Sequence, residues 1–285
     1  MSAWLPTAPC TPHTCAGHNG PARGTAAATA LLLAGCSLVL AGVVCAVPVA
    51  LLGAGPRDRL IRWWAYGVVR AFGVRIRVTG VPYPYPGTVR AGAPGALVVA
   101  NHISWLDIPL VAAVVPGRML AKSDIRRWPV LGPLAALGGT LFVERDRLRA
   151  LPATVRAVAE ALRGGSRVVA FPEGSTWCGR GTGGRFRPAV FQAAIDAGAE
   201  VRPVCISYRT GATGGPVAGA AAFVGDDPLG ASLWRVVRAA GLTAEIRVLP
   251  PIPAGTGPGR RELARTAQTT VASDSANRSA ESVHH

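Results

Sequence analysis

The residues with the clearest chemical potential surround a short apolar run. His102 follows the run Ala96–Ala100, and Asp107 follows His102 after four intervening residues. The run predicts a buried strand, and the apolar spacing over 104–114 predicts a helix that Ser104 can cap. If this helix begins near Ser104, the carboxylate of Asp107 can fold back towards the imidazole.

A histidine held by a carboxylate is a general base. The carboxylate fixes the tautomer and stabilises the imidazolium, so the other ring nitrogen is left to take a proton from a hydroxyl. The same residues also fit a structural role, in which His102 is buried beside a strand end and Asp107 complements the dipole of the helix. This stretch alone leaves both interpretations open.

Three further predicted strands end in polar residues. Lys122 follows the run 118–121, and the segment Glu173-Gly174-Ser175 follows the run 166–171 and Pro172. Arg145 is the last residue of the run 139–145. Because the carboxyl ends of strands in an α/β sheet open into one crevice, we expect these groups to converge with His102 on a site. Gly174 would let the backbone approach a ligand closely, and neighbouring N–H groups could hold an anion.

Two of these features have plain alternatives. Lys122 is the only lysine among 30 Lys and Arg residues. Either this position needs a compact ammonium group, or lysine has been retained here by chance. The glycine-rich segment 179–184, followed by Arg185 and Arg187, fits a mobile basic lip over the crevice or a solvated turn.

The elements that must position these groups alternate between strands and helices from residue 98 to 249. This order predicts an α/β domain with a mixed, mostly parallel sheet flanked by helices. A chain of 285 residues and 29.3 kDa holds one sizeable core and little else, so we expect one domain with short additional segments.

The segment before the domain is apolar and then basic. Residues 25–56 carry no charge and exceed the roughly 20 residues that cross a bilayer, which favours a transmembrane helix over a cleaved signal or a re-entrant hairpin. Residues 57–79 are rich in arginine and contain Trp63, Trp64 and Tyr66, as in an interfacial segment or an amphipathic helix on the domain. Since the arginines follow the span, we expect a single-pass protein of the cell membrane with a cytoplasmic domain.

Both ends of the chain are predicted to lack a fixed fold. Residues 1–24 are rich in Pro, Thr, Gly and Ala, and residues 253–285 are polar with many small side chains. The first segment contains Cys10, His13, Cys15 and His18 at spacings that could catch a metal ion. No predicted element would hold a tetrahedral site there, so we expect no metal.

The charge of the chain points to a membrane partner. The net charge is +15 and the sequence pI is about 11.1, yet the aromatic residues are not interleaved with the basic ones and no nucleic-acid-binding signature occurs. The mean hydropathy of +0.31 is that of an apolar chain. A basic surface on such a chain suits an anionic membrane face and phosphorylated substrates, and we expect no nucleic-acid partner.

Four ordered motifs resemble those of the glycerolipid acyltransferase family. They are Asn101-His102-x-Ser104-x-x-Asp107, Gly139-x-x-Phe142-Val143-x-Arg145, Phe171-Pro172-Glu173-Gly174-Ser175 and Val201-x-Pro203-Val204. Each motif alone is weak evidence, whereas four in order at plausible spacing are specific. The resemblance extends over residues 80–252, and it implies that the acyltransferase domain lies there. The family usually has Thr in place of Ser175 and often Ile-Asp-Arg where this chain has Val-Glu-Arg; both changes are mild.

The resemblance implies a reaction and roles for the residues. It implies acyl transfer from acyl-CoA or acyl-carrier protein to a lysophospholipid hydroxyl, with the hydroxyl of 1-acylglycerol 3-phosphate as the first acceptor and phosphatidate as the product. Lyso-ornithine lipid, glycerol 3-phosphate or a glycolipid are alternative acceptors, and a non-enzymatic lipid-binding protein is the alternative class. The resemblance makes His102 the base, Asp107 its orienting partner, and Arg145 with 173–175 the acceptor site. No cofactor is expected, because the thioester is already activated.

Overall fold

The computed structural model describes residues 8–18, 20–81, 94–144, 147–181, 183–211, 216–254 and 259–281. A seven-stranded sheet forms its centre, in the order β1-β7-β6-β2-β5-β3-β4. All neighbouring strands are parallel except β6 and β7, so the predicted mixed, mostly parallel sheet is confirmed. The strands are β1 (Arg75–Gly80), β2 (Ala96–Ala100), β3 (Arg118–Lys122), β4 (Leu141–Val143), β5 (Val168–Ala170), β6 (Glu200–Thr210) and β7 (Leu242–Val248).

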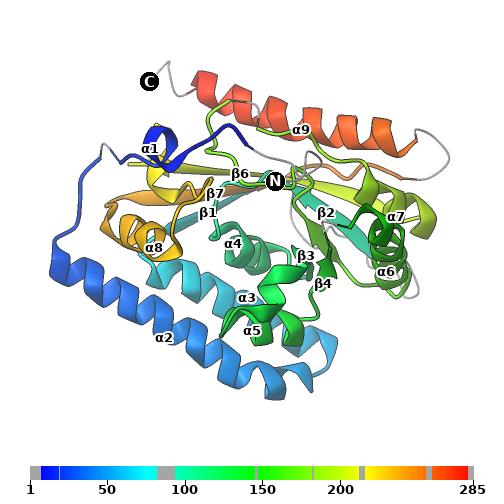
Figure 1. Ribbon diagram of the computed structural model, residues 1–285, viewed down its shortest axis with the longest axis horizontal. Coiled ribbons are helices and arrows are strands. Elements are labelled where there is room, and N and C mark those ends of the chain that lie inside the picture. Colours follow the sequence, from blue (N-terminus) through cyan, green and yellow to red (C-terminus); the bar gives the residue numbers. More distant parts are fainter. Residues whose placement is uncertain are drawn as a thin grey trace.

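Helices cover both faces of the sheet (Figure 1). Alternate residues of β2 face opposite ways: Val98 and Ala100 pack with α3, α4 and α8, whereas Leu97 and Val99 pack with α6, α7 and α9. This alternation builds two cores of a three-layer domain. The helices are α1 (Pro12–Cys15), α2 (Thr25–Ala50), α3 (Ala54–Ala71), α4 (Asp107–Val114), α5 (Leu131–Leu137), α6 (Leu151–Arg163), α7 (Ala189–Ala197), α8 (Leu229–Arg238) and α9 (Arg260–Glu281), with 3₁₀ turns η1 (Ser123–Arg127), η2 (Leu148–Ala150) and η3 (Gly219–Ala221).

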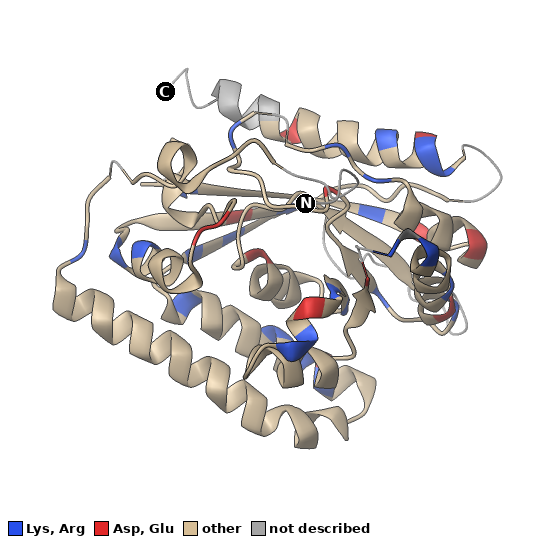
Figure 2. Ribbon diagram, viewed as in Figure 1, with Lys and Arg blue, Asp and Glu red and all other residues tan. Residues whose placement is uncertain are grey.

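The uncharged helix α2 lies beside the domain and pairs with α3 (Figures 1 and 2). At its start, the Arg23 guanidinium donates to the carbonyls of Val237, Ala239 and Gly73. Among the described residues, α2 is the one helix long and apolar enough to cross a membrane. The single-pass topology stays a prediction.

The two faces of α3 have different surroundings. Trp64 packs against α2 and donates from Nε1 to the Leu38 carbonyl at 2.9 Å. Trp63 and Tyr66 are exposed, by 71% and 47%. The predicted basic segment 57–79 is also not separate from the domain, because β1 begins at Arg75 and forms an edge strand of the sheet.

Both terminal segments are ordered where they are described, which corrects the prediction of two disordered tails. In α9 the side chains of Leu263, Ala264, Ala267 and Val271 are buried against the sheet side that carries α7. Their spacing makes one narrow apolar strip on a polar helix, and the average composition hides this strip. At the other end, Cys10 is buried, and partners far along the chain supply the burial.

Candidate active site

The site begins where β2 ends. The Asn101 side chain continues the pairing of β2 with β6: its Nδ2 donates to the Ile206 carbonyl at 2.9 Å, and its Oδ1 accepts from the Ile206 N–H at 2.8 Å. The amide thus replaces the backbone partners that Ile206 would otherwise lack. This anchor fixes the direction in which the chain leaves the sheet, and so places His102.

His102 and Asp107 form the predicted pair. Nδ1 of His102 lies 2.8 Å from Oδ2 of Asp107, and Asp107 is fully buried. Because an ionised carboxylate only accepts, Nδ1 carries the proton and Nε2 keeps its lone pair. The imidazole also stacks on the Phe171 ring, with centroids 4.2 Å apart, and its side chain is 21% exposed. The arrangement has the geometry of a general base with one accessible nitrogen.

Three further donors hold the Asp107 carboxylate. Oδ2 accepts from the backbone N–H groups of Ile103 at 2.6 Å and Ser104 at 2.9 Å, and Oδ1 accepts from the Tyr208 hydroxyl at 2.7 Å. Helix α4 starts at Asp107, so the carboxylate caps the turn before it, and Ser104 is not the helix cap. Burial, together with the charge of Asp107, raises the pKa of Tyr208 well above its usual range, so its hydroxyl stays protonated and donates.

Tyr208 was missed by the sequence analysis. It lies on the buried strand β6, outside all four motifs, and is only 1% exposed. One signal was available, because a tyrosine in an apolar strand usually needs a partner for its hydroxyl. The identity of that partner depends on how β6 lies against β2.

Glu173 connects the loop after β5 to the histidine. Its Oε2 accepts from the His102 N–H at 2.7 Å, and its Oε1 accepts from the Gly184 N–H at 2.9 Å. Burial raises the pKa of Glu173 to about 7, while these two N–H groups act in the opposite direction. Gly183 adopts a φ of +70°, and a Cβ atom there would meet Glu173 Oε1 at 2.4 Å. Glu173 therefore positions the backbone of the site.

The loop that carries Glu173 is closely constrained. Gly174 adopts a φ of +78°, a conformation that favours glycine. The Oγ of Ser175 is buried and has no hydrogen-bond partner among the described residues. Downstream, the Phe186 N–H donates to Gln268 of α9, and the Arg187 N–H donates to the Pro172 carbonyl. Residues 183–187 are thus tied to the site and to α9 through their backbone, while the side chains of Arg185 and Arg187 are exposed.

A cavity lies beside His102 and Glu173. One wall comes from α9, a helix that the sequence analysis had predicted to be disordered. The other walls come from the strand ends and the loop after β5. The lining residues are Asn101, His102, Ile103, Glu173, Trp177, Gly179, Gly181, Gly183, Ile206, Val271, Ala272 and Ser275.

Of the predicted site residues that the structure describes, His102 and Glu173 line this cavity, whereas Asp107, Gly174, Ser175 and Lys122 do not. Lys122 ends β3 as predicted, but its side chain is 46% exposed and its Nζ lies 3.6 Å from Asp124 Oδ2. Arg145 lies outside the described residues. The structure therefore joins His102, Asp107 and Glu173 directly, and places 174–175 in the adjoining loop.

Comparison with known proteins defines the class of this protein. The family model described as Acyltransferase matches residues 75–207, which contain the whole pair and Glu173. The chain belongs to this family and is an acyltransferase of the glycerolipid type.

Particular relatives differ in the acceptor that their names give. The lyso-ornithine lipid O-acyltransferase of Pseudomonas aeruginosa is 40% identical over 215 residues, covering 75% of this chain and 78% of the relative. The 1-acyl-sn-glycerol-3-phosphate acyltransferase of Neisseria meningitidis is 38% identical over 191 residues, covering 67% and 70%. The crystal structure of the 1-acyl-sn-glycerophosphate acyltransferase PlsC from Thermotoga maritima shares the fold, with a TM-score of 0.62, 20% identity and coverage of 87% and 94%.

Proposed function

We propose that this protein transfers an acyl group from acyl-CoA or acyl-carrier protein to the free hydroxyl of a lysolipid. The observation that carries the proposal is the His102–Asp107 pair, whose free Nε2 belongs to a residue that lines the cavity. An alcohol is a poor nucleophile until its proton is removed, and a positioned histidine contributes a rate factor of about 10²–10⁴.

The chemical step follows from that geometry. Nε2 of His102 takes the hydroxyl proton while the oxygen attacks the thioester carbon and forms the new C–O bond. The tetrahedral intermediate then collapses with cleavage of the C–S bond, and the imidazolium returns the proton to the leaving thiolate. Asp107 stabilises the imidazolium between the two steps. The thioester is already activated, so this sequence requires no cofactor.

We further propose that the α2–α3 hairpin holds the site at the cytoplasmic membrane surface. The most apolar 18-residue stretch of α2 has a mean hydropathy of 2.6, and only 6% of that stretch is buried. Exposed apolar side chains follow one another along the hairpin: Leu33, Leu40, Val44, Val47, Leu51, Leu52, Leu60 and Trp63. A continuous apolar surface of this kind suits lipid, and tethering raises the local concentration of a membrane-bound acceptor.

Two acceptors have specific support. Lysophosphatidate is the first, because the motifs include Arg145, whose planar fork can bind two phosphate oxygens. Lyso-ornithine lipid is the second, because the 40% identical relative is named for it. In either case the hydroxyl would meet the same base.

The test is acyl transfer by purified protein in lipid nanodiscs. Labelled acyl-CoA or acyl-carrier protein is offered with lysophosphatidate, lyso-ornithine lipid or glycerol 3-phosphate. We expect product from one lysolipid, and a loss of about 10³-fold or more in His102→Ala. His13→Ala, which changes an exposed histidine, is the matched control and should retain activity. A folded wild-type protein that acylates nothing, or an active His102→Ala variant, would contradict the proposal.

A further inference from the structure

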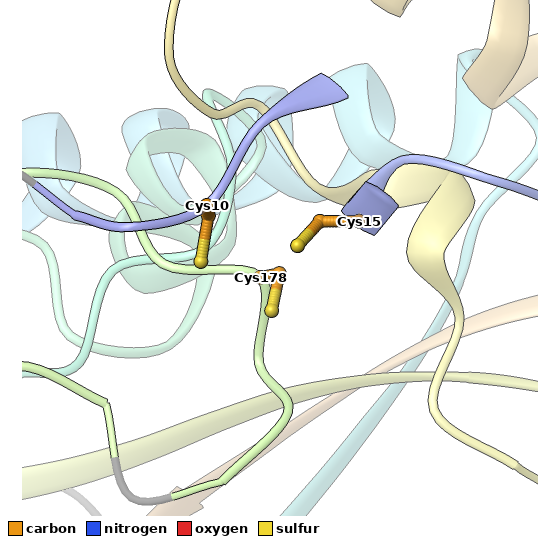
Figure 3. A group of neighbouring side chains, drawn as sticks. All are labelled: Cys10, Cys15 and Cys178. Carbon is orange, nitrogen blue, oxygen red and sulfur yellow. The ribbon is translucent and has the colours of Figure 1, made fainter. Parts of the chain in front are cut away.

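Three cysteine side chains from distant parts of the sequence meet outside the proposed active site. Figure 3 shows Cys10 and Cys15 of the N-terminal segment facing Cys178 of the loop after β5. All three sulfur atoms lie within 4.8 Å of one another. Cys10 and Cys178 are buried, and Cys15 is partly exposed.

We propose that Cys10, Cys15 and Cys178 bind one zinc ion. Zinc–thiolate bonds of about 2.3 Å in a tetrahedral site bring sulfur atoms to roughly 3.8 Å from each other, which three sulfurs within 4.8 Å reach with small shifts. The partly exposed side of Cys15 leaves room for a fourth ligand from solvent. Thiolate sulfur is a ligand that zinc prefers.

The surroundings of the cluster favour a metal over a disulfide. A disulfide joins two sulfurs and would leave the third thiol unused, whereas a metal ion uses all three. The turn that carries Cys15 is also pre-formed: Thr11 caps α1 by accepting from the Thr14 N–H, and the Thr14 hydroxyl lies 3.5 Å from Cys15 Sγ. Such a neighbouring hydroxyl can hold a ligand thiolate in place.

The N-terminal segment is fixed on the domain at the position that the site requires. Cys10 and Cys178 pack with Ala222 and Val224 in a small apolar cluster. Gly219 lies directly under the turn, because a Cβ atom there would meet the Cys15 carbonyl oxygen at 2.6 Å. Tertiary contacts of the surrounding residues therefore contribute to bringing the three sulfurs together.

The zinc site would also act on the active-site loop. Trp177, the residue before Cys178, donates its backbone N–H to the His102 carbonyl at 2.7 Å, and Gly179 lines the cavity. An ion on Cys178 would therefore tie residues 10–15 to the loop that supports His102. We assign zinc a positioning role here, with no part in the chemical step.

The experiment measures metal binding by the full-length protein. Reduced, chelator-treated protein in nanodiscs is titrated with Zn²⁺ against a chromophoric competitor, and with Co²⁺ to detect thiolate-to-metal charge-transfer absorption. We expect one equivalent of Zn²⁺ and a cobalt spectrum typical of thiolate ligation. Cys10→Ser, Cys15→Ser and Cys178→Ser should each weaken zinc binding at least tenfold and change that spectrum.

Matched variants make the test specific to the three residues. Cys45→Ser changes an exposed cysteine of α2, and His13→Ala changes an exposed neighbour in α1; both should bind zinc like the wild type. Circular dichroism checks that each variant is folded. Failure of the wild type to bind zinc would overturn the proposal, and so would a Cys178→Ser variant that binds zinc like the wild type.

Discussion

The carboxyl ends of β2 and β3 both present a basic side chain, yet only one of them is held in a defined position. At the end of β2, His102 is bound through a carboxylate that accepts four hydrogen bonds and is fully buried. At the end of β3, Lys122 makes a 3.6 Å ion pair with Asp124, and both side chains are about half exposed.

The difference shows what turns a strand end into a site. His102 and Lys122 both lie at the carboxyl end of a parallel strand, and this shared position explains why both were candidate site residues. Only at β2 do other elements supply fixed partners, from β6 through Tyr208 and from the loop after β5 through Glu173. A base needs one stable tautomer and orientation, which an exposed ion pair does not provide.

Asp107→Asn should break the β2 arrangement most strongly. The Asn amide nitrogen donates and cannot accept, so it cannot replace both carboxylate oxygens that accept hydrogen bonds in the wild type. The His102 tautomer with its proton on Nδ1 then loses its stabilising acceptor. We expect acyl transfer to fall by about 10³-fold at saturating acceptor. Asp124→Asn, which changes the exposed acid beside Lys122, is the control and should stay near wild type. Equal activity in both variants would show that the buried carboxylate does not orient the base.

Glu173→Gln should change the pH dependence of stability. In the folded protein the pKa of Glu173 is raised from 4.5 to about 7, so between these values the folded state holds a proton that the unfolded state has released. The free energy of unfolding therefore decreases as pH rises through this window, by about 3 kcal/mol in total.

Denaturation of wild type and Glu173→Gln from pH 4 to 8 measures this contribution. The unfolding free energy of the variant should lack the pH-dependent decrease assigned to Glu173. The variant also loses one of the two hydrogen bonds that Glu173 accepts, because a Gln side chain has one acceptor oxygen. Glu160→Gln, which changes an exposed acid on α6, should keep the wild-type slope. Parallel curves for wild type and Glu173→Gln would show that Glu173 does not retain its proton in the fold.

Tyr208→Phe tests the contribution of β6 to the pair. Removing the hydroxyl leaves Asp107 Oδ1 buried without its 2.7 Å donor, which costs about 2 kcal/mol in unfolding free energy. We expect acyl transfer to fall by about tenfold, because the carboxylate keeps its other three donors. Tyr66→Phe, at an exposed position on α3, is the control. Unchanged stability in Tyr208→Phe would remove β6 from the positioning of the base.

Lys122→Ala should have the smallest effect. An exposed ion pair contributes little, so we expect less than about a twofold change in acyl transfer and in the acceptor concentration for half-maximal rate. Kinetics over a range of acceptor concentrations measure both. A large loss would place Lys122 in the substrate-binding set and remove the contrast between the two strand ends.

The terminal segments show where composition is a poor guide. The polar composition of 253–285 predicted disorder, yet four small or apolar residues of α9 form a buried strip, and Val271, Ala272 and Ser275 line the cavity. The apolar run of α2 predicted a transmembrane helix, and the run itself did not reveal that Arg23 bonds the start of this helix to the domain or that α3 packs along it. The mean hydropathy of a segment indicates how apolar a helix is, but it does not indicate which other element that helix packs against.

The α/β class, the family motifs and the His102–Asp107 pair could be predicted from the order of the residues alone. These features depend on local order: strand and helix periodicity, and a spacing of five residues that one turn can close. The bond from Tyr208 to Asp107, the bond from the His102 N–H to Glu173 and the approach of Cys10 to Cys178 could not be predicted from residue order. These contacts join residues about 70 to 170 positions apart, and the packing of the sheet and its loops brings them within hydrogen-bonding or ligand distance.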